Sequence, residues 1–267
     1  MIKNSIRDQV LKLLSDIETE ENVRILYACE SGSRAWGFPS SDSDYDVRFI
    51  YINELKCYLS INDYRDVIER PINDQMDLSG WDIRKALNLY RKSNPPLLEW
   101  LKSPIIYIEK YSFAQELRKL LPEFYSPISS MYHYMNMAKG NVREYLKGDE
   151  VWVKKYFYVL RPILACKWIM KDLGPIPMEF EIMVDKIIKK DELRTAIEDL
   201  LEQKHKGKEL SWGPKIPIIN EFIESEMSKF DPQDIQKKIK KPDVDKLNEV
   251  FRLSLEEVWK VKLTPHV

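Results

Sequence analysis

The segment from residue 30 to residue 52, ESGSRAWGFPSSDSDYDVRFIYI, places an acid-x-acid pair at the start of a predicted strand. From Tyr45 to Ile52 the chain is rich in β-branched and aromatic residues, and side chains in a strand alternate between its two faces. Asp44 and Asp46 are therefore predicted to share one face, with the apolar side chains of residues 47, 49 and 51 on the other. Two neighbouring carboxylates repel each other unless a cation lies between them. The spacing predicts a divalent-cation site on a rigid strand.

A glycine-serine turn precedes this acidic pair. Residues 23–29, VRILYAC, predict an earlier strand, so Gly32 and Ser33 lie at its exit. Glycine lets backbone N–H groups approach phosphate oxygens there, and the Ser33 hydroxyl adds a donor. Mg²⁺ prefers oxygen ligands and completes its shell with nucleotide phosphates. The turn and the acids together indicate metal-dependent phosphate chemistry, with Arg34 either contacting a phosphate or pairing with the acidic loop.

Other loop motifs fit the segment less well. Asp42, Asp44 and Asp46 have the spacing of the first three EF-hand ligands, but Val47 stands where that loop requires glycine and Asn53 where it requires glutamate. A P-loop is excluded because Phe-Pro stands where Lys-Ser or Lys-Thr should follow the second glycine. The alternative that stays open is a solvated hairpin turn, rich in Asp and Ser, that binds no ligand.

The Gly-Ser turn and the Asp-Tyr-Asp-Val string resemble the signature of the nucleotidyltransferase superfamily that includes DNA polymerase β, kanamycin nucleotidyltransferase and the minimal nucleotidyltransferases. Together with residues 76–107 and 154–169, the longer string from residue 32 to residue 52 is similar to the branch called RlaP, whose phage members are associated with RNA ligase and RNA repair. The resemblance extends roughly from Arg24 to Trp212. It implies an α+β fold, in which a small mixed-sheet, polymerase β-like domain is followed by an all-helical C-terminal domain.

The resemblance also implies a third carboxylate on a neighbouring strand. Asp77, in the short strand predicted at residues 75–78, is the best match, whereas Asp82 is predicted in the first turn of a helix, where its charge suits the helix dipole. Asp44 and Asp46 would then hold two metal ions, Mg²⁺ or alternatively Mn²⁺. Asp77 would hold the catalytic ion and accept the proton of the attacking hydroxyl. From spacing alone, Asp77 fits an ordinary strand-end acid equally well.

Domain organisation follows from the periodicity of apolar residues. Residues 1–110 are predicted to form the catalytic domain and residues 111–267 a helical substrate-binding domain. The predicted helices are 6–17, 82–90, 113–121, 126–146, 152–173, 192–206, 216–230 and 244–261, and the remaining predicted strands are 67–69 and 105–108. Within the helix predicted at 152–173, Lys154 and Arg161 share a face and Lys155 lies next to it, so these cations are candidates to bind the nucleoside triphosphate. A solvated helix face explains them equally well.

Composition limits the classes of partner. The chain has 42 basic and 43 acidic side chains and a net charge of −1, which argues against a basic protein that coats nucleic acid. Three widely spaced cysteines give no disulfide framework, and three histidines give no zinc motif. The N-terminus lacks the apolar core of a signal peptide, and Arg161 and Lys167 interrupt the longest apolar run. We therefore expect a cytoplasmic protein without a membrane partner.

These features favour a Mg²⁺-dependent nucleotidyltransferase that moves a nucleoside monophosphate from an NTP to a hydroxyl acceptor and releases pyrophosphate. The resemblance implies an RNA or tRNA terminus as the acceptor, while a small-molecule or protein hydroxyl stays open. A different class is a nucleotide-sensing or partner-binding module, similar to an antitoxin, that keeps the fold without turnover. The motifs of serine hydrolases and of dinucleotide-binding folds are absent from the sequence.

Overall fold

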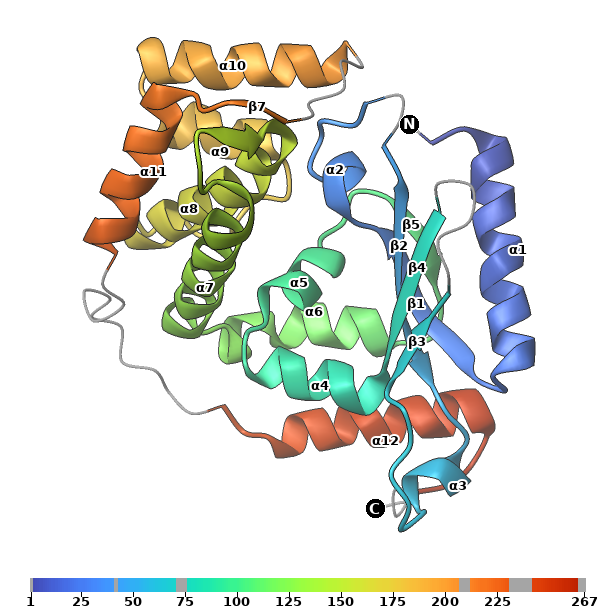
Figure 1. The fold of residues 1–267 in the computed structure, drawn as a ribbon. Helices are drawn as coiled ribbons and strands as arrows, with labels where there is room; N and C mark the ends of the chain where they lie inside the picture. Colours follow the sequence, from blue (N-terminus) through green and yellow to red (C-terminus); the bar gives the residue numbers. More distant parts are fainter. Residues whose placement is uncertain (1, 41–42, 71–75, 207–211, 231–241, 264–267) are drawn as a thin grey trace. The chain divides into compact units, whose positions relative to one another are not determined.

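The computed structural model describes residues 2–40, 43–70, 76–206, 212–230 and 242–263 (Figure 1). They form two compact units. The first unit contains the described residues within 1–32, 44–125 and 239–267, and the second unit contains those within 33–43 and 126–238. In these ranges, none of the helices combines the length and the apolar character that crossing a membrane requires.

The first unit is built on a five-stranded mixed sheet with strand order β3-β4-β2-β1-β5. Strands β2 and β4 are parallel, and every other neighbouring pair is antiparallel. Its elements are α1 (Asn4–Glu20), β1 (Arg24–Glu30), β2 (Tyr45–Ile52), α3 (Leu55–Tyr58), β3 (Val67–Glu69), β4 (Met76–Asp82), α4 (Ile83–Arg91), α5 (Pro95–Trp100), β5 (Ile106–Glu109), α6 (Phe113–Phe124) and α12 (Asp245–Trp259). The predicted mixed sheet is confirmed.

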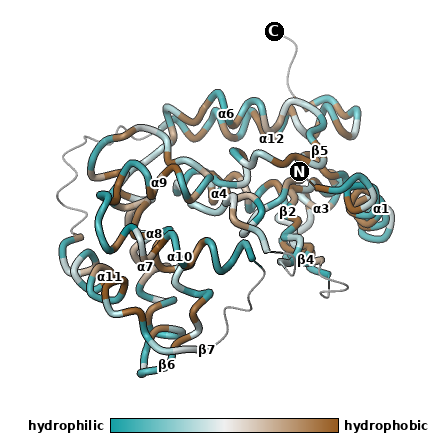
Figure 2. The backbone as a smooth tube through the Cα atoms, turned by 90° about the horizontal axis from the view of Figure 1, so that it is seen from above, coloured by the Kyte–Doolittle hydropathy of each residue, from teal (hydrophilic) through white to brown (hydrophobic). Residues whose placement is uncertain are grey.

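Both faces of this sheet are covered, because the apolar residues of β2 alternate as its pleat requires. Val47 and Phe49 pack with Val10 and Leu14 of α1, whereas Ile50 lies in the core formed with α4, α5 and α6. Figure 1 shows α1 on one side of the sheet and α4 to α6 on the other. Figure 2 shows hydrophilic and hydrophobic residues alternating around α1, as expected for a helix with one buried stripe.

The last helix of the chain, α12, belongs to the first unit. Leu247 and Val250 lie in its core, and the Trp259 indole Nε1–H donates to the main-chain oxygen of Asn53 at 2.8 Å. The domain boundary predicted at residues 110/111 therefore differs from the structure, in which α6 and α12 both pack with the sheet and the division falls after Tyr125. Periodicity identifies the apolar stripe of a helix, but it does not say which core that stripe joins.

The second unit is almost entirely helical, which confirms the predicted fold class. Its elements are α7 (Pro127–Tyr145), β6 (Glu150–Trp152), the 3₁₀ helix η1 (Val153–Lys155), α8 (Tyr156–Met170), α9 (Phe180–Ile187), α10 (Glu192–His205), β7 (Trp212–Pro214) and α11 (Pro217–Lys229). Nearly all of α8 is buried, and Phe38, from the segment 33–43, stacks on Phe157 with ring centroids 4.7 Å apart. The small β6-β7 ribbon was not predicted, and α8 begins at Tyr156 rather than at residue 152.

Candidate active site on strands β2 and β4

Two acidic side chains meet on adjacent parallel strands of the first unit. Asp46 of β2 and Asp77 of β4 are direct partners in the strand register, so their side chains project from the same face of the sheet. Arg48 lies two residues further along β2 on this face. Its Nη2 donates to Oδ1 of Asp46 at 3.0 Å and to Oδ2 of Asp77 at 2.6 Å. The two carboxylates thus share one positive charge, as their mutual repulsion requires.

These carboxylates remain accessible. The side chains of Asp46 and Asp77 are 25% and 31% exposed, and that of Arg48 is 18% exposed. Arg48 is further held by Nη1, which donates to the main-chain oxygen of Asp77 at 2.9 Å and so connects the two strands. Arg48 was not among the residues selected from the sequence, although its spacing of two from Asp46 on a strand placed it on the same face.

Gly32 packs directly against the first of these acids. Its backbone has φ +57°, and a Cβ atom at this position would lie 1.9 Å from Oδ2 of Asp46. The N–H of Ser31 donates to the main-chain oxygen of Asp46 at 2.8 Å, which draws the turn against the start of β2. Both the positive φ and the close approach require a residue without a side chain. The predicted Gly-Ser turn therefore lies beside the predicted carboxylate.

A buried acid supports Asp46 from within the sheet. Glu30, the last residue of β1, is 0% exposed, and its Oε1 accepts the Asp46 backbone N–H at 2.9 Å. Its Oε2 accepts the Tyr107 hydroxyl at 2.5 Å. Neither Glu30 nor Tyr107 was selected from the sequence. The available signal was a glutamate that directly follows an apolar strand, where a buried acid needs donors of its own.

Asp44, the first acid of the predicted acid-x-acid pair, lies one residue before β2 and is exposed. Over the ranges that the structure describes, no group of three or more His, Cys, Asp or Glu side chains is arranged to hold a metal ion. Asp46 and Asp77 nevertheless share a cationic partner, and carboxylate oxygens are the donors that Mg²⁺ prefers. Arg48 pairs with both acids in this structure, and a divalent-cation site formed by Asp44, Asp46 and Asp77 stays a prediction.

Ser33 and Arg34 lie in the short helix α2 (Gly32–Ala35). Nη2 of Arg34 donates to the main-chain oxygen of Ser43 at 2.6 Å, which links α2 to the residue just before Asp44. Of the two acids predicted as alternative partners of Arg34, Asp42 and Asp44, the first lies outside the described residues. Ser33 is partly exposed, and its main-chain oxygen accepts the N–H of Phe38 at 3.0 Å. The observed contacts of Arg34 therefore include one that stabilises the loop.

The predicted stripe of phosphate-binding cations does not form. Lys154 and Lys155 lie in η1, outside α8, and Arg161 is only 2% exposed. The Arg161 guanidinium carbon lies 4.8 Å from the centroid of the Trp36 ring, and its Nη2 donates to the main-chain oxygen of Met178 at 3.3 Å. The predicted shared face was wrong because it assumed one helix from residue 152, whereas α8 starts at Tyr156 and Arg161 lies in the core. Phosphate binding by Lys154 and Lys155 stays a prediction.

Asp82, at the far end of β4, has a structural role. It is the N-cap of α4, and its Oδ1 accepts the backbone N–H of Arg84 at 2.7 Å, which agrees with its predicted place at a helix start. Its Oδ2 accepts from the Tyr58 hydroxyl and from Asn53 Nδ2 at 2.7 and 2.9 Å. Burial raises the pKa of Asp82 above its ordinary value although these donors oppose the shift.

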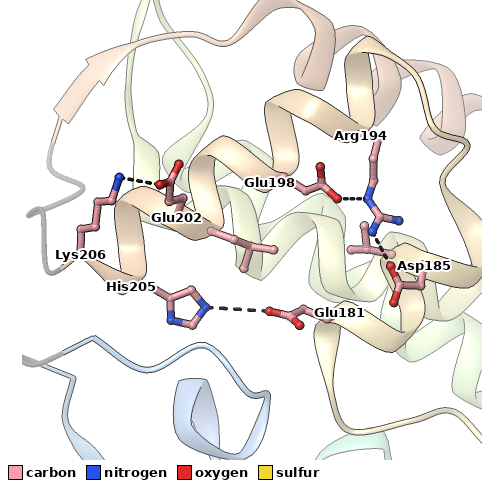
Figure 3. A pocket seen from close by; sticks show the side chains of 9 residues that line it. Glu181, Asp185, Arg194, Glu198, Glu202, His205 and Lys206 are labelled. Carbon is pink, nitrogen blue, oxygen red and sulfur yellow. Dashed lines mark hydrogen bonds and ion pairs between the residues drawn. The ribbon is translucent and has the colours of Figure 1, made fainter.

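A separate pocket of about 500 Å³ lies in the second unit between α9 and α10 (Figure 3). Arg194 pairs with Asp185 and Glu198, and Figure 3 shows His205 directed at Glu181 across the opening, with 3.9 Å between Nε2 and Oε1. Four acidic side chains line this pocket, against two permanent cations and one histidine. The excess of acids disfavours a triphosphate, and none of the predicted site residues lines it.

Comparison with known proteins identifies similar chains. The model of the RlaP family, described as an RNA repair pathway DNA polymerase beta family, matches residues 6–253. The uncharacterized protein YcgL of Bacillus subtilis (strain 168) is 50% identical over 256 residues, which cover 96% of this chain and 98% of that protein. A crystal structure of a nucleotidyltransferase-like protein from Exiguobacterium sibiricum 255-15 aligns with 12% identity and a TM-score of 0.31, covering 96% of this chain and 91% of the other.

Proposed function

Because this chain belongs to the RlaP family, an RNA repair pathway DNA polymerase beta family, we propose that it is a Mg²⁺-dependent nucleotidyltransferase. It moves a nucleoside monophosphate from an NTP to a hydroxyl acceptor and releases pyrophosphate. The observation that carries this proposal is the pair formed by Asp46 and Asp77, which lie side by side on parallel strands and both pair with the Arg48 guanidinium. Gly32 packs directly against Asp46 of this pair, and a glycine turn is the kind of backbone that can contact phosphate oxygens through its N–H groups.

In the proposed reaction, the acceptor oxygen bonds to the α-phosphorus while the bond from that phosphorus to the bridging oxygen of the β-phosphate breaks. Asp44, Asp46 and Asp77 would hold divalent ions, which would neutralise the charge on the attacking and leaving oxygens. The carboxylate of Asp77 would take the proton of the attacking hydroxyl. Glu30 keeps the backbone of Asp46 in place through the bond to its N–H. The electron pair of the broken bond leaves with pyrophosphate.

The proposed acceptor is an RNA end. The description of the family, which connects it to RNA repair, supports this choice. A near-neutral net charge of −1 means that attraction to RNA depends on local clusters of cations rather than on the whole surface. A small-molecule or protein hydroxyl as acceptor would make RNA affinity irrelevant to the rate.

The test incubates the purified protein and Mg²⁺ with each α-³²P-labelled NTP and with tRNA, single-stranded RNA, small alcohols or protein acceptors. We expect label transfer to RNA by the wild type and none by Asp44→Ala/Asp46→Ala. The matched control is Asp8→Ala/Asp16→Ala, which removes two exposed acids of α1 and should keep transfer. Undiminished transfer by the first variant would contradict the assignment, and circular dichroism verifies that both variants fold.

A further inference from the structure

The β6-β7 ribbon of the second unit presents two tryptophans on one face. Trp152 and Trp212 are direct partners in this antiparallel pair, so both side chains project to the same side. On the opposite side, Val151 is 0% exposed and a Cβ atom at Gly213 would lie 3.3 Å from the side chain of Val153. The inner side of the ribbon is therefore packed. Its outer side leaves Trp212 61% exposed.

Two lysines lie beside Trp152 of this ribbon. Nζ of Lys155 lies 5.0 Å from the centroid of the Trp152 ring and 4.3 Å from that of Tyr145. Nζ of Lys154 lies 5.3 Å from the Trp152 ring. The rings of Tyr145 and Trp152 meet edge to face with centroids 5.8 Å apart. We call these four residues and Trp212 the aromatic-lysine patch.

Packing alone does not explain this patch. Large apolar side chains stabilise a fold through the area that they bury, and Trp212 buries less than half of its surface. Burial and the charge of Lys154 both lower the pKa of Lys155. Two lysines in sequence beside the partly buried Trp152 ring and the exposed Trp212 ring suit an anionic ligand that itself has flat rings.

We infer that the aromatic-lysine patch binds single-stranded nucleic acid, with a base stacked on Trp212 and the phosphates beside Lys154 and Lys155. Aromatic side chains next to cations are the general means of holding unpaired bases, because every base has a π-face and every linkage a negative charge. Glu150 lies on the same face of the ribbon as Trp152 but at the opposite end from the lysines, which favours phosphates at the lysine end. Only the choice of RNA rather than DNA as the bound strand rests on the proposed function.

The test is fluorescence anisotropy of the full-length protein with a fluorescein-labelled 12-nucleotide RNA, without NTP or metal. We expect Trp212→Ala to raise Kd about tenfold or more, and Trp212→Phe to retain most of the affinity. Lys154→Gln should reduce the slope of log Kd against log salt by about 0.7. The control is Tyr132→Ala, which removes an aromatic side chain that is 51% exposed on α7 of the same unit and should leave Kd unchanged.

Parallel titrations with DNA of the same sequence and with duplex RNA identify the ligand. Binding of either single strand in preference to the duplex supports the inference, and the stronger of the two identifies the strand. A wild-type protein that binds none of them, or a folded Trp212→Ala variant with unchanged Kd, would overturn it. Because neither nucleotide nor metal is present, a failure of label transfer leaves this result intact, and the two proposals fail separately.

Discussion

Spacing along an element relates side chains of the candidate site in the first unit, whereas it failed for the predicted cation stripe of the second unit. On the strands, a spacing of two places Asp46 and Arg48 on one face, and the parallel register brings Asp77 beside them. On the predicted helix, a spacing of seven places Lys154 beside Arg161 only if the helix is continuous between them. It is not, and Arg161 is buried. Periodicity predicts neighbours reliably only within an element whose ends are known.

The largest effect should come from Asp77→Asn, which keeps the shape of the side chain and removes its charge. If Asp77 holds a divalent ion and takes a proton, label transfer should fall about 10²- to 10³-fold. The measurement is kcat under saturating NTP and acceptor, with Asp16→Asn on α1 as a control that keeps its activity. A loss of less than tenfold would show that Asp77 is an ordinary strand-end acid. The spacing argument would then have failed in the first unit as well as in the second.

Arg161→Gln tests the other side of the comparison. A cation whose guanidinium lies over Trp36 in the core should stabilise the second unit, so this change should lower the free energy of unfolding by about 2 to 4 kcal/mol. Lys154→Gln, in the partly exposed η1, should change it by less than about 0.5 kcal/mol. Urea unfolding followed by tryptophan fluorescence measures both. Equal stability of the two variants, with a raised KM for NTP in Arg161→Gln alone, would restore the predicted role in phosphate binding.

Gly32→Ala tests how tightly the turn packs against the carboxylate. The added Cβ meets Oδ2 of Asp46 and the residue must keep φ +57°, so we expect a loss of about 1 to 3 kcal/mol in stability. The control is Gly140→Ala in the helix α7, where a Cβ has open space and should add up to about 1 kcal/mol. A neutral Gly32→Ala variant with full activity would mean that the turn has no required approach to Asp46.

Apart from Asp77, which came from the family resemblance, the site residues that could be predicted lie close together along the chain. Asp44, Asp46 and the Gly-Ser turn follow from one segment, and strand alternation is enough to relate them. Glu30 and Tyr107 could not be paired from the sequence, because 77 positions separate them and only the antiparallel arrangement of β1 with β5 brings them together. Arg48 was within reach of the same strand argument but was not selected.

The same distinction applies to the fold. Strands β2 and β3 and helices α6, α7, α10 and α11 lie where the pattern of apolar residues predicts them. The helix α9, of only eight residues, was missed. The β6-β7 ribbon was missed too, since three residues of strand are too few for any periodicity to appear. The return of α12 to the first unit depends on long-range contacts of its apolar stripe, such as Leu247, which no local pattern contains.

Arg48→Gln should have a smaller effect on stability, because all three charged groups are partly exposed. Removing the guanidinium leaves Asp46 and Asp77 without their shared cation, and we expect a loss of about 1 to 2 kcal/mol without metal. Added Mg²⁺ should raise the melting temperature of this variant more than that of the wild type. Asp77→Asn/Arg48→Gln, which lacks one of the two acids, should lose that extra response. If Mg²⁺ affects all three proteins equally, the pair does not hold a divalent ion.

The smallest effect concerns Asp82, the buried acid at the other end of β4. Because its pKa is raised in the folded state, folding favours its protonated form. The contribution of Asp82 to the free energy of unfolding is therefore fully present below the ordinary pKa of a carboxyl. It is lost as pH rises through the pKa of Asp82 in the folded protein. Asp82→Asn keeps an N-cap side chain but cannot titrate. The free energy of unfolding of this variant should therefore fall less than that of the wild type between about pH 4 and pH 7.

Urea unfolding across this pH range measures the difference, which should be below about 1 kcal/mol because the donors Tyr58 and Asn53 partly compensate for burial. Asp82→Asn should also retain label transfer, in contrast to Asp77→Asn five residues earlier on the same strand. Loss of transfer in a folded Asp82→Asn variant would extend the active site to both ends of β4, and the distinction between a catalytic and a capping acid on this strand would fail.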